Sequence, residues 1–313
     1  MATPISQSIL VTGGAGFIGT HLCAELVRRG NQVIVIDLKT PARVIAGVEY
    51  IQGDVRNSAL IEKNLDRVQT VYHLAATVSV PLCQNDPVES YSNNFTATLI
   101  ILDAIRKKMV EQKRVIRFAF ASTAALYGDA GNDGRALKEE DAADRFLSYY
   151  AAQKANSEQA IDLYRKTHGI PALAFRFFNV FGPGQDPSSP YSGVITVFAR
   201  FAKEGKPMPL NGGGTQTRDF ISVYDLVGAL ADSLKLSEAK WDASPINLGT
   251  GKVITVRELA ETIKSVSGTA SEITVAPPRE GDVLHSKADI SRARQVLQFN
   301  PSHSLRDGLR ELI

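Results

Sequence analysis

The sequence predicts an α/β fold, a Rossmann-like doubly wound parallel sheet with a smaller, interleaved C-terminal lobe. Three observations support this prediction. Short β-branched runs alternate with segments whose apolar residues recur about every 3.6 positions, a glycine-dense turn follows the first run, and glycine- and proline-rich connections replace the alternation after Phe178. Such alternation is typical of βαβ units whose strands are buried on both faces.

The predicted strands of the first half are short, apolar and bounded by turn residues. They are Ser8–Thr12, Gln32–Asp37, Glu49–Gly53, Val71–Ala75, Val115–Ser122 and Ala172–Phe177, and Ile246–Gly249 is expected to add one more core strand. Helices are predicted over Phe17–Arg29, Phe95–Lys108, Val194–Lys203 and Ser222–Leu236. The segment Gly128–Asp144, with its charge run at 138–141, is expected to be a solvated loop.

Composition narrows the classes of function. With 313 residues and 44% hydrophobic content, the chain can bury a large core. Its net charge of +2, with both signs mixed, offers no basic stripe for nucleic acid or an anionic membrane surface. Only Cys23 and Cys83 are present, and the five histidines show no ligand spacing, so neither a disulfide framework nor a metal site is expected. Without a signal peptide or a long apolar run, a cytoplasmic protein is expected.

The glycine-dense turn Thr12–Gly19 predicts a dinucleotide site. It matches the fingerprint Gly14-x-Gly16-x-x-Gly19 and also a wider spacing that starts at Gly13. The turn lies between a predicted strand and a predicted helix, where backbone N–H groups and the positive helix end can meet a pyrophosphate. A turn needed only for chain reversal is the alternative.

Two carboxylates follow the next two strands. Asp37 lies 18 residues beyond Gly19, where a carboxylate can accept hydrogen bonds from the adenosine ribose and disfavour a 2′-phosphate. NAD is therefore expected rather than NADP, although Lys39 and Arg43 lie nearby. Asp54 is either a contact of the adenine amino group or a helix N-cap.

Tyr150 and Lys154 are the candidate catalytic pair. Four residues apart in a predicted helix, they share one face. A lysine ammonium and the positive nicotinamide ring are expected to lower the pKa of the phenol for proton transfer. The strand before them delivers Ser122 and Thr123 to the sheet edge where α/β sheets bind ligands. Thr123 is either a hydroxyl that contacts the substrate or an ordinary strand or capping residue.

An ordered set of motifs resembles the extended short-chain dehydrogenase family, most closely its UDP-sugar 4-epimerases. The motifs are Thr12–Gly19, His73–Ala76, Ala121–Gly128, Tyr150-x-x-x-Lys154, Arg176–Pro183, Gly213–Phe220, Asn247–Gly249 and Arg279–Asp282. They cover nearly the whole chain. The resemblance implies an NAD-dependent enzyme that inverts C4 of a UDP-hexose through a transient 4-keto sugar, and a homodimer.

The resemblance also implies roles for individual residues. Thr123, Tyr150 and Lys154 would carry the chemistry and contact the substrate. NAD would be held by Gly13, Gly16, Phe17, Ile18, Gly19, Asp37, Asp54, Val55, Leu74, Ala75, Ala76, Asn94, Ser122, Tyr150, Lys154 and Phe177. The nucleotide sugar would meet Thr123, Tyr150, Asn179, Val194, Arg218, Arg279 and Ser286. The implied domains are an NAD-binding domain over 1–178 with about 216–248, a nucleotide-sugar lobe over 179–215 and 249–313, and a ligand cleft between them.

Several alternatives stay open. Sugar dehydratases and decarboxylases of this family commonly carry an acidic residue after the catalytic hydroxyl, whereas Ala124 and Ala125 follow Thr123 here. A nucleotide-sugar reductase or dehydrogenase would release its reduced cofactor. A non-catalytic NAD-binding sensor or scaffold is the alternative from another class. Ser286, small where relatives limit the room beside the sugar C2 substituent, is expected to admit an N-acetylated sugar, unless it is a surface loop residue.

Overall fold

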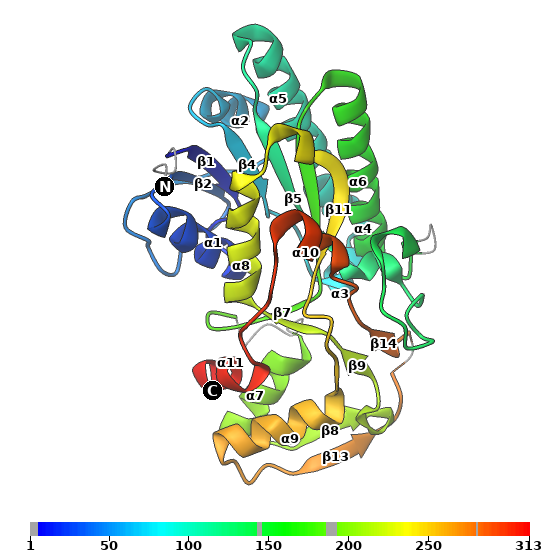
Figure 1. Cartoon of the computed structure of the whole chain (residues 1–313). Helices are drawn as coiled ribbons and strands as arrows, with labels where there is room; N and C mark the ends of the chain where they lie inside the picture. The colour runs from blue at the N-terminus through cyan, green and yellow to red at the C-terminus, as the bar shows by residue number, and fades with distance from the viewer. Residues whose placement is uncertain (1–5, 143–145, 186–192, 280) are drawn as a thin grey trace. The chain divides into compact units, whose positions relative to one another are not determined.

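The structure is a computed structural model that describes residues 6–142, 146–185, 193–279 and 281–313. The chain forms two compact units (Figure 1). Unit 1 comprises Met1–Thr123, Ser148–Arg176 and Val227–Ile246, and unit 2 comprises Ala124–Leu147, Phe177–Leu226 and Asn247–Ile313. Glu280 and part of the connection Gly182–Pro190, both noted in the sequence, lie outside the described residues.

A seven-stranded sheet forms the centre of unit 1, in the order β11-β6-β5-β4-β1-β2-β3. Its strands are β1 (Ser8–Thr12), β2 (Gln32–Asp37), β3 (Val48–Gln52), β4 (Thr70–His73), β5 (Arg117–Thr123), β6 (Ala172–Phe177) and β11 (Asp242–Leu248). The ladders from β3 to β5 are parallel. The order reverses between β1 and β4, which confirms the predicted Rossmann-like fold and makes the carboxyl ends of these strands the expected ligand edge.

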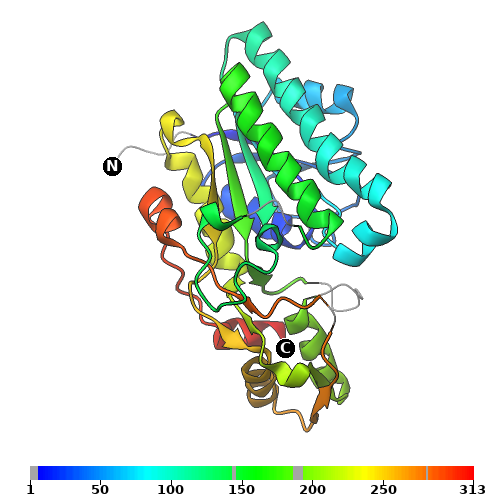
Figure 2. The same cartoon turned by 90° about the vertical axis from the view of Figure 1, so that its right-hand side faces the viewer.

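Helices cover both faces of this sheet. The helices that belong to unit 1 in whole or in part are α1 (Phe17–Arg28), α2 (Ser58–Leu65), α3 (Val80–Asn85), α4 (Pro87–Tyr91), α5 (Ala97–Gln112), α6 (Tyr149–His168) and α8 (Val223–Asp232). Figures 1 and 2 show α1 and α8 on one face and α2, α5 and α6 on the other. Because both faces are covered, strands such as β2 read as continuous apolar runs, and four of its six residues are buried.

Helix α6 has clear boundary signals in the sequence. Ser148 caps its amino end by accepting a hydrogen bond from the backbone N–H of Ala151 at 3.2 Å. Gly169, at a φ of 69°, ends the helix in the left-handed conformation that glycine adopts without strain. Arg165 and Lys166 lie in the last turn, where cations favour the helix dipole. These signals fix where Tyr150 and Lys154 stand on the first turns.

The helix before β5 differs from its prediction. It was expected over Phe95–Lys108, whereas a π-helical turn over Ser92–Thr96 leads into α5. Asn94 lies within that turn, and its side chain bonds to groups outside the helix. Single π-helical turns are frequent at functional sites, and they depend on tertiary contacts that apolar spacing does not reveal.

Unit 2 is built from small sheets and helices. Its strands are β7 (Asn179–Phe181), β8 (Met208–Asn211), β9 (Thr217–Arg218), β10 (Phe220–Ser222), β12 (Ile254–Thr255), β13 (Ile273–Ala276) and β14 (His285–Ser286), and its further helices are α7 (Val194–Glu204), α9 (Val256–Ser267), α10 (Ser291–Leu297) and α11 (Leu305–Leu312). A separate core joins α7, α9 and α11 through buried residues such as Phe198, Leu259 and Leu309.

The segment Gly128–Asp144 is not a simple solvated loop, so that prediction was wrong in part. Glu139 is only 6% exposed, and its carboxylate accepts a hydrogen bond from the backbone N–H of Asn247 at 2.9 Å. Leu137 is also buried and pairs with Ala288 in an isolated parallel bridge. The charge run therefore contains one buried carboxylate, that of Glu139, and its partner Asn247 lies more than a hundred residues further along the chain.

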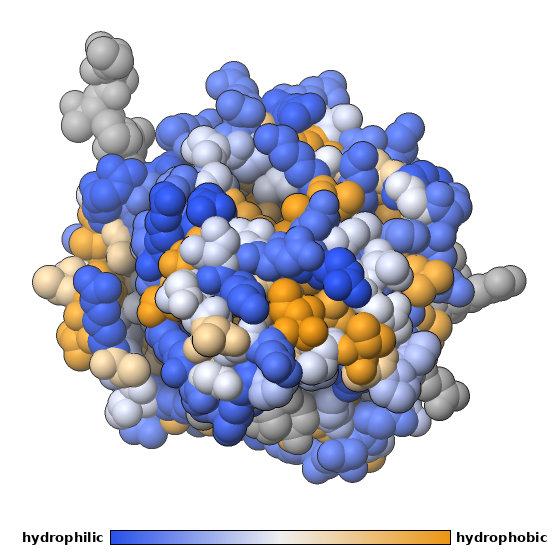
Figure 3. Space-filling view, turned by 90° about the horizontal axis from the view of Figure 1, so that it is seen from below, coloured by the Kyte–Doolittle hydropathy of each residue, from blue (hydrophilic) through white to orange (hydrophobic). Residues whose placement is uncertain are grey.

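The lower face in Figure 1 is seen directly in Figure 3, where hydrophilic residues surround a small group of apolar ones. Val275 of β13 contributes an exposed apolar side chain to unit 2. Within the described ranges, no helix is both long and apolar enough to cross a lipid bilayer.

Candidate active site

The glycine turn after β1 is shaped by close backbone approaches. Gly13 has a φ of 73°, and a Cβ there would lie 2.6 Å from the backbone nitrogen of Ala75. A Cβ on Gly19 would overlap the carbonyl oxygen of Gly13. Both positions therefore require glycine. Gly16 precedes α1 without a side-chain cap, so the N–H groups of the first turn, which includes Phe17 and Ile18, can meet an anion.

Asp37 lies beside this turn at the end of β2. Its carboxylate accepts hydrogen bonds from the backbone N–H groups of Ala15, at 3.0 Å, and Lys39, at 2.9 Å. Asp54 follows β3, and the adjacent Gly53 donates its N–H to the Asp37 carbonyl at 2.8 Å. The strand register thus brings these two carboxylates to the same edge of the sheet.

Asp54 does not cap the helix that follows it, so the N-cap alternative was wrong. Asn57 caps α2 by accepting from Leu60 at 3.1 Å. Asp54 instead forms an ion pair of 2.7 Å with Arg56, whose hydrogen bonds lower the pKa of this carboxyl. Val55, also expected to help hold NAD, follows Asp54 and is buried.

The turn Leu74–Ala76 is tied to the glycine turn by a buried pair. The Thr12 hydroxyl accepts from the Ala75 N–H at 3.3 Å and bonds His73 Nδ1 at 2.7 Å. Burial, together with the positive charge of Lys154, lowers the pKa of His73 to about 3, so this imidazole is neutral. A neutral ring can hold Thr12 in one orientation without adding charge beneath the cofactor turn.

Asn94 connects the cofactor edge to the catalytic helix. Its side-chain oxygen accepts from the Thr77 N–H at 2.7 Å, and its amide donates to the Thr77 carbonyl at 3.0 Å and to Gln153 at 2.7 Å. Both polar atoms of the side chain thus bond to protein groups. Since Thr77 follows the Leu74–Ala76 turn and Gln153 precedes Lys154, Asn94 fixes the distance between the two groups of site residues.

Tyr150 and Thr123 meet at the carboxyl end of β5. Burial raises the pKa of Tyr150 to about 12, although the hydrogen bond with Thr123 acts to lower it. The protein's own groups therefore do not produce the lowered phenol pKa that the sequence predicted. The physical reason is that desolvation of a fully buried phenolate outweighs one hydrogen bond.

Lys154 is buried one turn further along α6. Its ammonium donates to the Ala121 carbonyl at 2.8 Å and lies 4.5 Å from the centre of the Phe120 ring. Burial lowers the pKa of Lys154 to about 7, although the negative charge of Glu158 acts to raise it. The charge of Lys154 near neutral pH therefore depends on the groups packed around it.

These residues fit a dinucleotide in chemical terms. The turn at Gly13 and Gly19 leaves no room for a Cβ, the first turn of α1 offers uncapped donors, and Asp37 offers acceptor oxygens. Tyr150, Thr123 and Lys154 line the carboxyl end of β5, two strands away from β1 in the sheet. Ser122, also expected to contact the cofactor, donates its hydroxyl to Glu158.

Unit 2 brings three of the expected substrate residues together. Arg218 and Ser286 are direct partners in the parallel ladder between β9 and β14. Asn179 donates its side-chain amide to the carbonyl of Asp219 at 3.0 Å, next to Arg218 in sequence. Arg218 forms an ion pair of 2.7 Å with Asp282, and burial lowers the pKa of its guanidinium, which this carboxylate opposes.

The remaining predicted residues are placed as follows. Arg279 is exposed, and its carbonyl accepts the N–H of Asp282 at 3.2 Å, so it lies one tight turn away from the partner of Arg218. Val194 begins α7 and packs on the core of unit 2. Phe177 is the last residue of β6.

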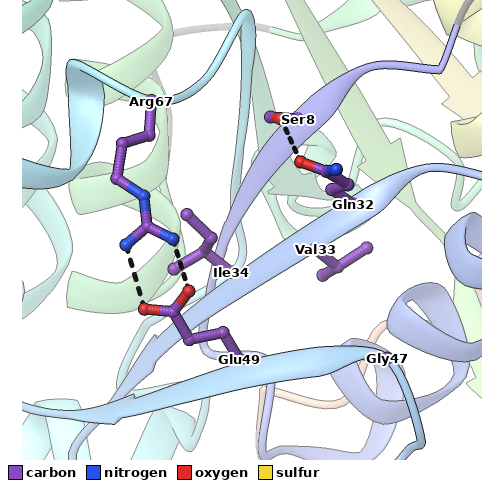
Figure 4. A pocket seen from close by; sticks show the side chains of 7 residues that line it. All are labelled: Ser8, Gln32, Val33, Ile34, Gly47, Glu49 and Arg67. Carbon is purple, nitrogen blue, oxygen red and sulfur yellow. Dashed lines mark hydrogen bonds and ion pairs between the residues drawn. The ribbon is translucent and has the colours of Figure 1, made fainter.

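A pocket of about 270 Å³ in unit 1 lies elsewhere (Figure 4). Ser8 and Gln32, the first residues of β1 and β2, line it with the ion pair of Arg67 and Glu49, whose closest atoms are 2.5 Å apart. Since the glycine turn follows the carboxyl end of β1, this pocket is at the opposite edge of the sheet. It is no part of the candidate active site.

Sequence reasoning missed several residues that support the site. Glu158 lies one turn beyond Lys154 and pairs with Arg176 at 2.7 Å, and Asp282 pairs with Arg218. Helical spacing of four from Lys154 was a signal that could have found Glu158. Gln153, which bonds Asn94, has no comparable signal because its partner comes from a distant helix.

Comparisons with known proteins agree with this geometry. Residues 9–249 match the family described as NAD dependent epimerase/dehydratase. A putative UDP-glucose 4-epimerase of Methanocaldococcus jannaschii is 33% identical over 311 residues, which cover 97% of both chains. A UDP-N-acetyl-alpha-D-glucosaminuronate decarboxylase of Bacillus cytotoxicus is 30% identical over 326 residues, covering 99% of this chain and 97% of the relative.

Solved structures give the same result. The UDP-glucose 4-epimerase of Thermus thermophilus, crystallised in complex with NAD, superposes with a TM-score of 0.85 at 33% identity, over 97% of each chain. A family match over most of the chain, with a relative above 30% identity along almost its whole length, shows common membership. The chain belongs to the NAD dependent epimerase/dehydratase family, and its cofactor is NAD.

Proposed function

We propose that this protein is an epimerase that inverts C4 of a UDP-hexose through a transient 4-keto sugar. The observation that carries the proposal is the hydrogen bond between Thr123 and the buried phenol of Tyr150, with Lys154 one helical turn away. This arrangement offers a base for a secondary alcohol and a hydroxyl to orient it. Relatives named as UDP-glucose 4-epimerases support the substrate class.

The proposed chemistry begins at the phenolic oxygen of Tyr150. As a phenolate, Tyr150 takes the proton of the sugar 4-hydroxyl, directly or through the hydroxyl of Thr123, and later returns it. When bound, NAD would supply the hydride acceptor, and then the hydride donor, for C4 of the sugar, so that no net oxidation would occur. Lys154 supplies a positive charge that favours the phenolate form of Tyr150, and burial excludes water that would weaken this attraction.

The residues that would bind the cofactor lie in unit 1. We assign the pyrophosphate to the turn at Gly13, Gly16 and Gly19 with the first turn of α1, and the adenosine ribose to Asp37. Asp54 and Val55 are assigned to the adenine, and the turn Leu74–Ala76 with Asn94 behind it to the rest of the dinucleotide. These assignments rest on the geometry described above.

The residues that would bind the nucleotide sugar are assigned to unit 2. Arg218 and Arg279 would form charge-assisted hydrogen bonds to the diphosphate, with Asn179 beside them. Arg218 would then share its guanidinium between the phosphate and Asp282, which holds it in place. Ser286, the ladder partner of Arg218, is small and leaves room for an N-acetyl group at the sugar C2.

A decarboxylase acting on a UDP-uronate is the second candidate. It is favoured by the relative named as a decarboxylase, which covers almost the whole chain. Ala124 and Ala125, which follow Thr123, offer no acid or base there and argue against a further proton-transfer step. The two candidates differ in their product, since only decarboxylation releases carbon dioxide.

The test is to incubate the purified protein with UDP-glucose, UDP-galactose, both N-acetylated forms and UDP-glucuronate, without added NAD. We expect the C4 stereoisomer of at least one hexose, measured by chromatography and NMR, with no accumulation of NADH. Carbon dioxide and a pentose product would establish the decarboxylase instead. A reductase would consume or release NADH in proportion to product.

Tyr150→Phe is the matched control, because it removes one oxygen and keeps the ring. We expect turnover to fall by at least about 10³-fold, within the range for loss of a general base, while NAD binding persists. Wild-type turnover in this variant would contradict the catalytic role of Tyr150. A protein that binds NAD but converts no sugar would be the sensor or scaffold of the alternative class.

A further inference from the structure

A buried cluster lies directly behind the catalytic lysine. Glu158 of α6 accepts from Arg176 of β6 through both carboxylate oxygens, at 3.0 and 2.7 Å, and from the hydroxyl of Ser122 of β5. The side chains of Arg176 and Glu158 are only 6% and 13% exposed. Three elements are therefore joined by one carboxylate in a water-poor region.

The cluster holds the strand end that carries the catalytic contacts. Ser122 stands between Ala121, whose carbonyl accepts the Lys154 ammonium, and Thr123, which bonds Tyr150. A hydrogen bond from Ser122 to Glu158 thus fixes the segment that contacts both catalytic side chains. Because Glu158 is on the same helix as Tyr150 and Lys154, this hydrogen bond fixes the position of α6 relative to the end of β5.

The cluster also carries charge next to Lys154. Glu158 is four residues beyond Lys154, so the two side chains share one face of α6. Opposite charges attract strongly at buried positions because the local dielectric is low. The ionisable groups that interact with Lys154 are Glu158 on α6, Cys83 on α3 and His73 on β4, and Arg176 on β6 is paired with Glu158.

We propose that Glu158 is a positioning residue that keeps Lys154 protonated during turnover and aligns α6 with the end of β5, with Arg176 setting the strength of its negative charge. The expected effect on turnover rests on the proposed function, whereas the expected effect on the protonation of Lys154 does not. Glu158 attracts the proton of Lys154, whereas Arg176 repels it and partly cancels Glu158. Ser122 contributes alignment without charge.

Two substitutions separate charge from structure. Glu158→Gln keeps the shape but removes the negative charge, so the pKa of Lys154 should fall by about one unit. Arg176→Gln leaves the charge of Glu158 uncompensated, so the pKa of Lys154 should rise. If Glu158 and Arg176 had only a structural role, the two substitutions would not shift the pKa of Lys154 in opposite directions. Ser122→Ala should lower kcat and leave this pKa unchanged.

The measurement is the pH titration of the Lys154 Cε and Nζ chemical shifts in full-length, NAD-loaded protein with isotope-labelled lysine. Lys154→Arg assigns the signal. If Glu158→Gln or Arg176→Gln fails to fold, Glu158→Asp and Arg176→Lys replace them, and both should keep the wild-type titration with a reduced kcat. The proposal would be overturned if Glu158→Asp or Arg176→Lys changed the pKa of Lys154. It would also be overturned if Glu158→Gln and Arg176→Gln shifted this pKa in the same direction or not at all.

Turnover gives the second readout. The alkaline fall of kcat should move to lower pH in Glu158→Gln and to higher pH in Arg176→Gln, with KM little changed. The titration of Lys154 requires no turnover. A wild-type protein without epimerase activity would therefore end the proposed function and still leave the chemical shifts to decide the role of Glu158.

Discussion

Lys154 shows how burial and function oppose each other at a single residue. It is 2% exposed, and its pKa of about 7 lies far below the ordinary value of 10.5. Between these two pH values the unfolded chain binds a proton that the folded chain has released. The free energy of unfolding therefore rises with pH across this window, and below about pH 7 the folded protein bears the full cost of a buried ammonium.

Replacing Lys154 by methionine should therefore stabilise the protein while abolishing turnover. We expect Lys154→Met to raise the free energy of unfolding at pH 7 by an amount on the order of a few kcal/mol, and by much less near pH 10. Thermal unfolding at the two pH values measures this. Lys166→Met, on the exposed side of α6, is the control and should change little at either pH. An equal effect of Lys154→Met at both pH values would contradict the lowered pKa.

At the scale of elements, the turn between β1 and α1 depends on backbone approaches that permit no side chain. Gly19 lies within α1, where a Cβ would overlap the Gly13 carbonyl oxygen. Gly228 also lies within a helix, α8, yet a Cβ there would meet nothing within 4 Å. The two glycines share a helical setting and differ only in what surrounds them.

Gly19→Ala should thus displace the turn and weaken NAD binding by more than about 100-fold, since pyrophosphate binding depends on the position of backbone donors. Gly228→Ala should bind NAD normally and gain about 0.5 to 1 kcal/mol of stability, because alanine favours a helix. Isothermal titration with NAD and thermal unfolding measure both effects. Similar affinity in the two variants would show that the turn tolerates a side chain.

Helix boundaries show where local signals suffice. The sequence predicts the end of α1 to within one residue, and the capping serine and terminal glycine of α6 are readable in advance. It misplaces the start of α5 because the π-helical turn depends on bonds from Asn94 to Thr77 and Gln153. Those bonds form only after three separate elements have packed.

At the scale of the whole molecule, too, local sequence predicts some features, whereas contacts between distant segments determine others. The strands β1, β2 and β6 match their predicted bounds because a parallel strand buried on both faces must be apolar along its length. The motifs of the candidate site follow from chemistry that needs particular residue types. The burial of Glu139 and the pairing of Arg218 with Asp282 could not be predicted, since each joins segments more than sixty residues apart.

Cofactor binding should register in the stability of the whole protein, because a ligand that binds only the folded state stabilises it by mass action. In protein freed of nucleotide, NAD at about 100 times its Kd should add about 2.7 kcal/mol and raise Tm by about 5 °C. NADP at the same concentration should raise Tm less, since the carboxylate of Asp37 at the end of β2 repels a 2′-phosphate. Asp37→Ser should narrow the difference between the two nucleotides. If NADP stabilises the wild-type protein as strongly as NAD, Asp37 does not select the cofactor, and Lys39 and Arg43 become the residues to replace next.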